Sequence, residues 1–185
     1  MRPARASRGY NHRMSTRTPV EVTVRPATRE DVPRITAIYN HYIEHTPVSF
    51  DLEPWTLEQR LEWFSHYGTT GRYRALVAER DADVVGYTTS SRFRQKQAYE
   101  MTVEMTIVCA PDAVGMGVGS RLYATIFPLL GSEDIHMAVA GITLPNEASC
   151  ALHERFGFER VGVEPEVGRK FGRYWDVAWY MRRVG

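Results

Sequence analysis

The order of elements in the chain predicts an α/β fold (α+β) with a mixed, mostly antiparallel seven-stranded sheet and helices on both of its faces. Segments rich in β-branched residues alternate with segments whose apolar residues recur at helical spacing, in the order βααβββαβαββ. Several neighbouring strands are separated only by short turns, which favours antiparallel pairs. The exception is the strand-helix-strand unit at residues 102–142, which predicts one right-handed parallel crossover.

The first half of the chain contains a strand, two helices and a hairpin. Apolar and polar residues alternate at the first strand until Pro26 ends it. Capping boxes, in which a Thr precedes an Asp or a Gln by three residues, begin helices at Thr28 and Thr56. The predicted elements are a strand at 21–25, a helix that ends near His45, a second helix after Thr56, and strands at 76–79 and 84–89 joined by a turn at 81–83.

The second half contains the parallel unit and two closing strands. After three glycines, apolar residues recur at helical spacing from Leu122 to Leu130. Pro128 removes one hydrogen bond from this helix, so we expect a kink or an early end there. Gly157 suits the position just beyond the next helix. The predicted elements are a strand at 102–109, the glycine-led helix, a strand at 135–142, a helix at 147–156, and strands at 158–163 and 174–181.

Length and composition predict a single domain at residues 20–185, preceded by a basic tail. Residues 1–19 contain five arginines and no acidic residue, so we expect this tail to be disordered, with an acidic partner as the alternative. The net charge of +1 argues against nucleic acid as a partner, and no apolar run is long enough to span a membrane. Two cysteines suggest no disulfide framework, which favours a cytoplasmic protein.

Gly115, Gly117 and Gly119 alternate between the strand at 102–109 and the helix that follows it. Glycines leave the backbone N–H groups of a turn uncovered, and a helix start adds unpaired donors with a partial positive charge. Such a corner suits a phosphate or a pyrophosphate. A Walker loop ends in Gly-Lys-Ser/Thr and a Rossmann turn reads G-x-G-x-x-G, so neither fits this spacing. A flexible turn with no ligand is the alternative.

Four stretches occur in a distinctive order along the chain. They are Thr102-Val-Glu104, Gly117-Val-Gly119-Ser120, residues 140–158 around Asn146, and residues 167–176. Together they resemble the phosphinothricin and methionine sulfoximine acetyltransferase branch of the GCN5-related N-acetyltransferases (GNAT). The resemblance covers roughly residues 22–183. It implies the GNAT fold, acetyl-CoA as co-substrate, and a small-molecule amine as acceptor.

By this resemblance, a strand, a turn and a helix bind the coenzyme. Main-chain groups of Ile107, Val108 and Cys109 would hold the pantetheine, and the glycine turn would hold the pyrophosphate. The family usually has Gln or Arg where this chain has Val114, so binding would rest on backbone N–H groups, with Arg121 as a candidate partner. The other residues assigned to the coenzyme are Gly115, Met116, Gly117, Val118, Gly119, Ser120, Asn146 and Ser149.

Two residues are candidates for proton transfer. Glu104 lies in an apolar strand, where partial burial would raise the pKa of its carboxyl group towards the working range of a general base. The resemblance gives the matching Glu this role, and the alternative is a cross-strand ion pair with Arg92 or Arg94. Many GNAT enzymes place a Tyr seven residues after the Asn of the helix to protonate the leaving thiolate. This chain has His153 there, which is either that acid or a residue of the helix face.

The resemblance places the acceptor near residues 92–99. Arg92, Phe93 and Arg94 match the family's substrate stretch and are candidates to bind a carboxylate, while Tyr99 and Phe50 are candidate walls for the side chain of the acceptor. The family often has Arg where this chain has Glu100, a change that would alter which substrate is preferred. Lys170, Phe171 and Arg173 match another family stretch, at the cleft or at a dimer contact.

These features predict an acetyl-CoA-dependent N-acetyltransferase that acts by direct transfer on the α-amine of an amino-acid analogue such as phosphinothricin or methionine sulfoximine. Cys109 is interpreted as a packed strand residue, because an acyl-enzyme would need a reactive thiol. Two alternatives stay open: acetylation of protein N-termini or another amine, and a non-catalytic acyl-CoA-binding module. The family precedent implies a homodimer, and no metal, nucleic acid or membrane partner is expected.

Overall fold

The computed structural model describes residues 21–185, so the predicted tail at 1–19 lies outside the described residues. The strands and helices follow the predicted order. They are β1 (Thr23–Pro26), α1 (Val32–His45), α2 (Leu57–Phe64), β2 (Ala75–Arg80), β3 (Asp83–Arg92), β4 (Thr102–Cys109), α3 (Val118–Gly131), β5 (Met137–Thr143), α4 (Glu147–Arg155), β6 (Glu159–Lys170) and β7 (Arg173–Arg183). Single 3₁₀ turns occur at Arg29–Asp31, Gln97–Tyr99 and Pro111–Ala113.

The seven strands form one sheet in the order β1-β2-β3-β4-β5-β7-β6. Every pair is antiparallel except β4 and β5, which run parallel and are connected through α3. The mixed sheet and the parallel crossover at residues 102–142 are therefore confirmed. A second crossover, through α4, leaves β7 between β5 and β6. The two-residue turn between β2 and β3 has Asp81 and Ala82 at φ +53° and +66°, as a tight hairpin requires.

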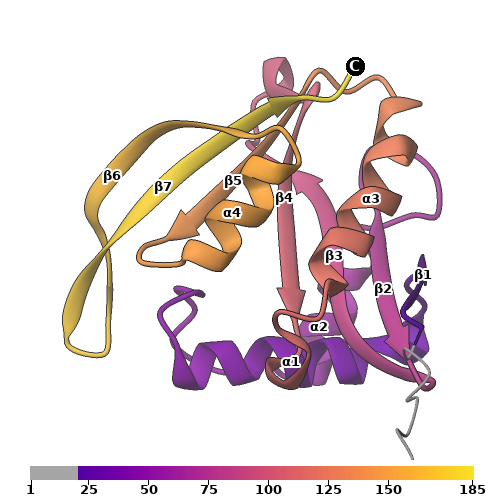
Figure 1. The fold of residues 1–185 in the computed structure, drawn as a ribbon, viewed down its shortest axis with the longest axis horizontal. Coiled ribbons are helices and arrows are strands. Elements are labelled where there is room, and N and C mark those ends of the chain that lie inside the picture. Colours follow the sequence, from indigo (N-terminus) through magenta and orange to yellow (C-terminus); the bar gives the residue numbers. More distant parts are fainter. Residues whose placement is uncertain (1–20) are drawn as a thin grey trace, which may run out of the picture.

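Helices cover both faces of the sheet. Two adjacent residues of β3, Gly86 and Tyr87, contact helices on opposite faces. The hydroxyl group of Tyr87 accepts a hydrogen bond from Arg60 of α2 at 2.8 Å. A Cβ atom added to Gly86 would lie 3.0 Å from Val118 of α3. Successive residues of a strand point to opposite faces, so α2 and α3 lie on opposite sides of the sheet (Figure 1). The core of the α3 face includes Leu122, Ile126 and Leu130, which are all fully buried.

Three elements are longer than the sequence suggested. The helix α3 continues through Pro128 to Gly131, because Pro128 and Ala124 are both exposed and the carbonyl group that Pro128 leaves without a partner can reach water. The last two strands are longer than predicted, at 12 and 11 residues. Mostly exposed residues at 164–170 show no strand pattern in the sequence, but the segment pairs with β7 on either side of a register shift between Glu164 and Gly168.

No helix among residues 21–185 combines the length and the apolar character that crossing a bilayer demands.

Candidate functional site

The strands β4 and β5 pair only at one end and then diverge. Their register runs from Thr102 opposite Met137 to Glu104 opposite Val139, while β4 stays paired with β3 as far as Cys109. Figure 1 shows the two strands separating beyond the point where they pair. The stretch of β4 after Glu104 therefore has a strand partner on one edge only, and its other edge faces the gap.

The pairing pattern tells which main-chain groups face that gap. The N–H group of Ala110 donates to the carbonyl of Val85 on β3 at 2.8 Å. Main-chain groups alternate between the two edges of a strand, so those of Val108 also face β3, while those of Ile107 and Cys109 face the gap. The predicted main-chain role therefore fits Ile107 and Cys109. It does not fit Val108, whose N–H and C=O groups face Tyr87.

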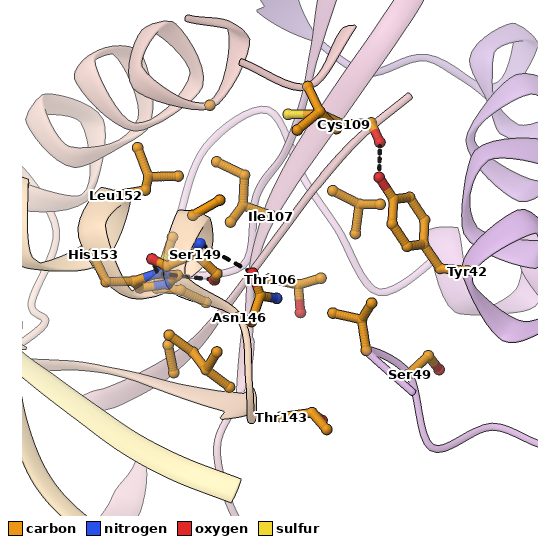
Figure 2. Close-up of a pocket in the computed structure, with 18 of the residues that line it drawn as sticks. Tyr42, Ser49, Thr106, Ile107, Cys109, Thr143, Asn146, Ser149, Leu152 and His153 are labelled. Atoms are coloured by element: carbon orange, nitrogen blue, oxygen red, sulfur yellow. Dashed lines mark hydrogen bonds between the residues drawn. The ribbon is translucent and has the colours of Figure 1, made fainter. Parts of the chain in front are cut away.

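A cleft of about 1060 Å³ occupies the gap. Its walls are the end of α1 and the loop that follows, the open edge of β4, the glycine turn, the end of β5, and α4. Figure 2 shows how these elements converge, with Tyr42 and Ser49 opposite Asn146 and Ser149. The predicted site residues that line it are Phe50, Glu104, Ile107, Val108, Cys109, Val114, Gly115, Gly117, Val118, Gly119, Ser120, Asn146, Ser149 and His153.

Glu104 lies at the point where β4 and β5 separate, and it lines the cleft. Burial raises the pKa of its carboxyl group above the ordinary value. Within residues 21–185 it forms no ion pair; Arg92 instead pairs with Glu100 at 3.6 Å. The alternative role of Glu104, a cross-strand ion pair with Arg92 or Arg94, is therefore not seen in the described residues. A half-buried carboxylate with no cationic partner is well suited to accept a proton near neutral pH.

The glycine turn ends at the start of α3, where the backbone requires glycine. Gly115 and Gly117 have φ values of +79° and +78°, and Gly117 is the N-cap residue of the helix. Gly119 allows a close approach, because an added Cβ atom would lie 2.9 Å from Leu152 of α4. The first turn of α3, Val118 to Ser120, lines the cleft, so N–H groups that have no partner within the helix, and a partial positive charge, lie at the mouth of a cavity.

The helix α4 contributes Asn146 and Ser149 to the cleft wall. The side-chain oxygen of Asn146 accepts a hydrogen bond from the backbone N–H of Ser149 at 3.1 Å, which caps the helix as its position predicts (Figure 2). The cap fixes where α4 begins. It therefore fixes the distance between the side chain of Ser149 and the open edge of β4.

His153 also lies on α4, but its ring is buried. Nδ1 lies 2.8 Å from the carbonyl of Ser149 and Nε2 lies 2.8 Å from the hydroxyl of Tyr123. A carbonyl can only accept, so Nδ1 carries the proton and Tyr123 donates to Nε2. Burial lowers the pKa of His153 below its ordinary value. Both nitrogens are engaged and the neutral form is favoured, which supports the helix-face interpretation over that of a general acid.

A pH titration of stability tests this reading of His153. Its pKa is lower in the folded state, so its neutral form adds stability that is present above about pH 6.5 and is lost as pH falls below that value. We expect the free energy of unfolding to fall between pH 7 and pH 5, and to fall less in His153→Gln. We also expect His153→Gln to lose stability while its turnover falls far less than that of Glu104→Gln. A larger loss of turnover would assign proton transfer to His153.

Cys109 is a packed residue of the strand. Burial raises the pKa of its thiol to about 11, although the backbone N–H of Gly119 partly opposes this shift. A thiol with so high a pKa is almost entirely protonated at pH 7 and is a poor nucleophile. The carbonyl of Cys109 accepts a hydrogen bond from the hydroxyl of Tyr42 at 2.8 Å (Figure 2). This contact ties α1 to the end of the open edge.

The loop between α1 and α2 covers one end of the cleft and is held by the closing hairpin. The buried ammonium group of Lys170 donates to the carbonyl of Ser49 at 2.7 Å. The ring of Phe50 packs against Gly168, where an added Cβ atom would clash with it. Phe50 therefore lines the cleft as predicted, and the chain also uses it to dock the loop on β6.

Four of the predicted acceptor residues lie outside the cleft. Arg92 pairs with Glu100, and the guanidinium of Arg94 lies 4.9 Å from the ring of Phe93. Phe93 in turn packs edge-to-face on Tyr99 and Trp179. None of Arg92, Phe93, Arg94 and Tyr99 lines the cleft, and Met116 of the glycine turn does not line it either. These residues lie at the end of β3 and in the segment after it, where they contact one another, Glu100 and Trp179, so their role in binding the acceptor stays a prediction.

Several lining residues were not predicted from the sequence, among them Tyr39, Tyr42, Asp51 and Arg155. Tyr39 and Tyr42 belong to the apolar face of α1, so only the structure separates a core tyrosine from a cleft tyrosine. Asp51 lies in the loop between α1 and α2, and no sequence motif marks it. Arg155 lies two residues after His153, at the end of α4, with no spacing signal of its own.

Comparison with known proteins identifies the family. The acetyltransferase (GNAT) domain family matches residues 24–179. The chain belongs to the GNAT acetyltransferase family. A phosphinothricin N-acetyltransferase of Streptomyces coelicolor is 53% identical over 164 residues, which cover 88% of this chain and 96% of that protein. An L-methionine sulfoximine/L-methionine sulfone acetyltransferase of Pseudomonas paraeruginosa is 34% identical, with 86% and 93% covered.

A solved structure shows the same fold with the coenzyme bound. The phosphinothricin acetyltransferase of Sinorhizobium meliloti in complex with acetyl-CoA superposes with a TM-score of 0.82, at 30% identity and with 89% of each chain covered. This GNAT enzyme is therefore an acetyl-CoA-dependent N-acetyltransferase. Residues 21–185 contain no group of three or more His, Cys, Asp or Glu side chains that would hold a metal ion.

Proposed function

We propose that the enzyme transfers the acetyl group of acetyl-CoA directly to the α-amine of a small amino-acid analogue, of the phosphinothricin or methionine sulfoximine type. The observation that carries this proposal is the position of Glu104. Its unpaired, half-buried carboxylate lies where β4 and β5 separate, at the inner end of a cleft whose mouth is the glycine turn. A thioester held along the open edge of β4 would end beside this carboxylate.

The coenzyme would bind as an extra partner of β4. The main-chain groups of Ile107 and Cys109 face the gap, so the amides of pantetheine can pair with them as a neighbouring strand would. The diphosphate would then lie at the start of α3, where N–H donors are unpaired. The N–H of Ile107 is a candidate donor to the thioester carbonyl, and such a donor stabilises the charge that develops on its oxygen.

Transfer requires the acceptor amine to lose a proton. Amines are mostly ammonium at pH 7, so Glu104, directly or through a water molecule, takes one proton from the nitrogen. The nitrogen attacks the thioester carbon, the C–N bond forms, and the C–S bond breaks. The nitrogen gives up a second proton and becomes the amide nitrogen, and the coenzyme leaves as a thiolate that takes up a proton. The high pKa of Cys109 disfavours a route through an acyl-enzyme.

Asp51 is a candidate to hold the acceptor amine before transfer. Its Oδ2 atom accepts hydrogen bonds from the hydroxyl of Tyr39 at 2.7 Å and from the indole of Trp55 at 3.1 Å. Its Oδ1 atom has no hydrogen-bond partner within residues 21–185. The carboxylate is therefore fixed in orientation, lines the cleft, and has one oxygen free to bind an ammonium group.

We expect Asp51→Asn to raise the KM for the acceptor roughly 10-fold, because the amide still accepts from Tyr39 and Trp55 but has no charge. The KM for acetyl-CoA should stay the same. Glu53→Gln is the matched control, since Glu53 is an exposed acid of the same loop that does not line the cleft. Equal acceptor KM values for the two variants would remove Asp51 from the acceptor site.

A thiol-release assay tests the proposed function. Acetyl-CoA is offered with a panel of amino acids, methionine sulfoximine, methionine sulfone, phosphinothricin and short peptides. Turnover of the amino-acid analogues is expected. Turnover of peptides alone would favour the alternative of protein N-terminal acetylation, and no turnover despite acetyl-CoA binding would favour a non-catalytic module.

We also infer a homodimer, following the family precedent. Exposed apolar side chains lie along β6 and β7 and the turn between them, including Val161, Val163, Val167, Phe171 and Tyr174. Burial of such side chains against a second copy would stabilise the association. Sedimentation of the full chain decides this point, and a monomer at micromolar concentration would contradict it.

A further inference from the structure

Arg155 has an unusual position among the residues of the cleft. It lies at the end of α4, and its Nη1 group donates to the hydroxyl of Ser120 at 3.2 Å. Ser120 belongs to the first turn of α3, directly after the glycine turn. Two helices that are separate in the sequence therefore bring a guanidinium group to the place where the backbone N–H groups of α3 are unpaired.

The positive charge of Arg155 also distinguishes it from the other residues of the cleft wall. Among the described residues that line the cleft, Arg155 alone carries a fixed positive charge. Its side chain is exposed and forms no ion pair within residues 21–185. An exposed guanidinium with unused donors, beside a helix start, is suited to bind an anion with two adjacent oxygens.

The glycine turn itself provides no charged side chain for such an anion. Val114 and Met116 are exposed and apolar, and Val114 occupies the position where the family usually has Gln or Arg. Arg121 was the replacement that the sequence suggested. It follows Ser120 on α3 but does not line the cleft, because the next residue of a helix points about 100° away from its neighbour.

We propose that Arg155 replaces the missing side chain of the turn and binds the pyrophosphate of the coenzyme from α4, with Ser120 orienting its guanidinium group. This inference rests on the proposed function, since it assigns a residue to the same coenzyme site. Arg155 is then a binding residue for acetyl-CoA. It has no part in the attack on the thioester, which takes place at the other end of the cleft.

The test compares coenzymes that differ in their phosphates. We expect Arg155→Ala to raise the KM for acetyl-CoA and the Kd for CoA roughly 10-fold, with kcat nearly unchanged and with partial recovery in Arg155→Lys. The same variant should lose as much affinity for 3′-dephospho-CoA, which keeps the pyrophosphate. Wild type and Arg155→Ala should use S-acetylpantetheine, which has no phosphate, equally well.

Each other outcome overturns the assignment. If Arg155→Ala binds 3′-dephospho-CoA as tightly as wild type, Arg155 binds the 3′-phosphate and not the pyrophosphate. If the variant also uses S-acetylpantetheine less well than wild type, its defect is structural. A larger loss of CoA affinity in Arg121→Ala than in Arg155→Ala would make Arg121 the residue that binds the pyrophosphate. The proposed function fails separately, because it fails only if the wild-type enzyme acetylates no amino-acid analogue.

Discussion

Glu104→Gln is expected to lower kcat at neutral pH by roughly 10²-fold or more, while the Kd for acetyl-CoA stays unchanged. Glutamine keeps the size and the polarity of the side chain but cannot accept a proton from the amine. The pKa of Glu104 is raised by burial, so the wild-type rate should rise with pH through a value above the ordinary pKa of a glutamate. The pH profile of Glu104→Gln should lack the rise that reports the pKa of Glu104. It should keep only the rise at higher pH that reports deprotonation of the acceptor amine.

Stability provides the control for this variant. The folded-state pKa of Glu104 lies above its unfolded value, so its contribution to stability is present at low pH and is lost as pH rises through the folded pKa. At pH 7 Glu104→Gln removes a carboxylate that is costly to bury, and its free energy of unfolding should equal or exceed that of wild type. A loss of activity that accompanies a loss of stability would contradict a role in proton transfer.

Glu100→Gln is the matched change in the same segment. Glu100 pairs with Arg72 and Arg92 outside the cleft, so its loss should leave turnover within about twofold of wild type. A similar loss of turnover in Glu104→Gln and Glu100→Gln would mean that the rate depends on the negative charge of this segment and not on the position of Glu104 in the cleft. The rate would then have to depend on another base.

The part of the site that could be predicted from the sequence is the part that local chemistry determines. Gly115 and Gly117 are needed because the turn adopts positive φ values, and Asn146 is needed because a helix begins there. Such residues have a signature within a few positions of themselves. The order of strands and helices also follows from local patterns, and the structure confirms it.

The rest of the site depends on contacts between segments that are distant in the sequence. Asp51 and Arg155 enter the cleft only because a loop docks on β6 through Lys170 and because α4 approaches α3 at Gly119. The resemblance assigns main-chain groups of Val108 to the coenzyme, but these groups face β3. Whether an edge is free depends on where β5 diverges from β4, and no single segment contains that information.

The second large effect is expected at the start of α3, where the same substitution should act in opposite directions on stability and on coenzyme binding. Ser120 is the third residue of the helix after its N-cap, Gly117. An aspartate at this position interacts favourably with the partial positive charge of the helix start, so Ser120→Asp should equal or exceed wild type in thermal stability, by up to about 1 kcal/mol. It should nevertheless weaken acetyl-CoA binding.

The loss of binding has two causes. A carboxylate in the first turn of α3 would repel the diphosphate, at a cost of about 4 kcal/mol for unit charges 4 Å apart near a protein surface. It would also engage the guanidinium group of Arg155, which donates to Ser120 in the wild-type enzyme. We therefore expect the Kd for CoA to rise by roughly 10²-fold or more, and the effect to weaken at high salt.

Calorimetric titration with CoA and thermal unfolding of the same samples check this prediction. Ser120→Asn is the control, since it has nearly the same shape as aspartate without the charge, and it should bind CoA within a few-fold of wild type. Use of S-acetylpantetheine should not differ among the three proteins, because that thioester carries no phosphate. If Ser120→Asp binds CoA as tightly as Ser120→Asn, the start of α3 does not hold the diphosphate, and the thioester would not be placed beside Glu104 by this route.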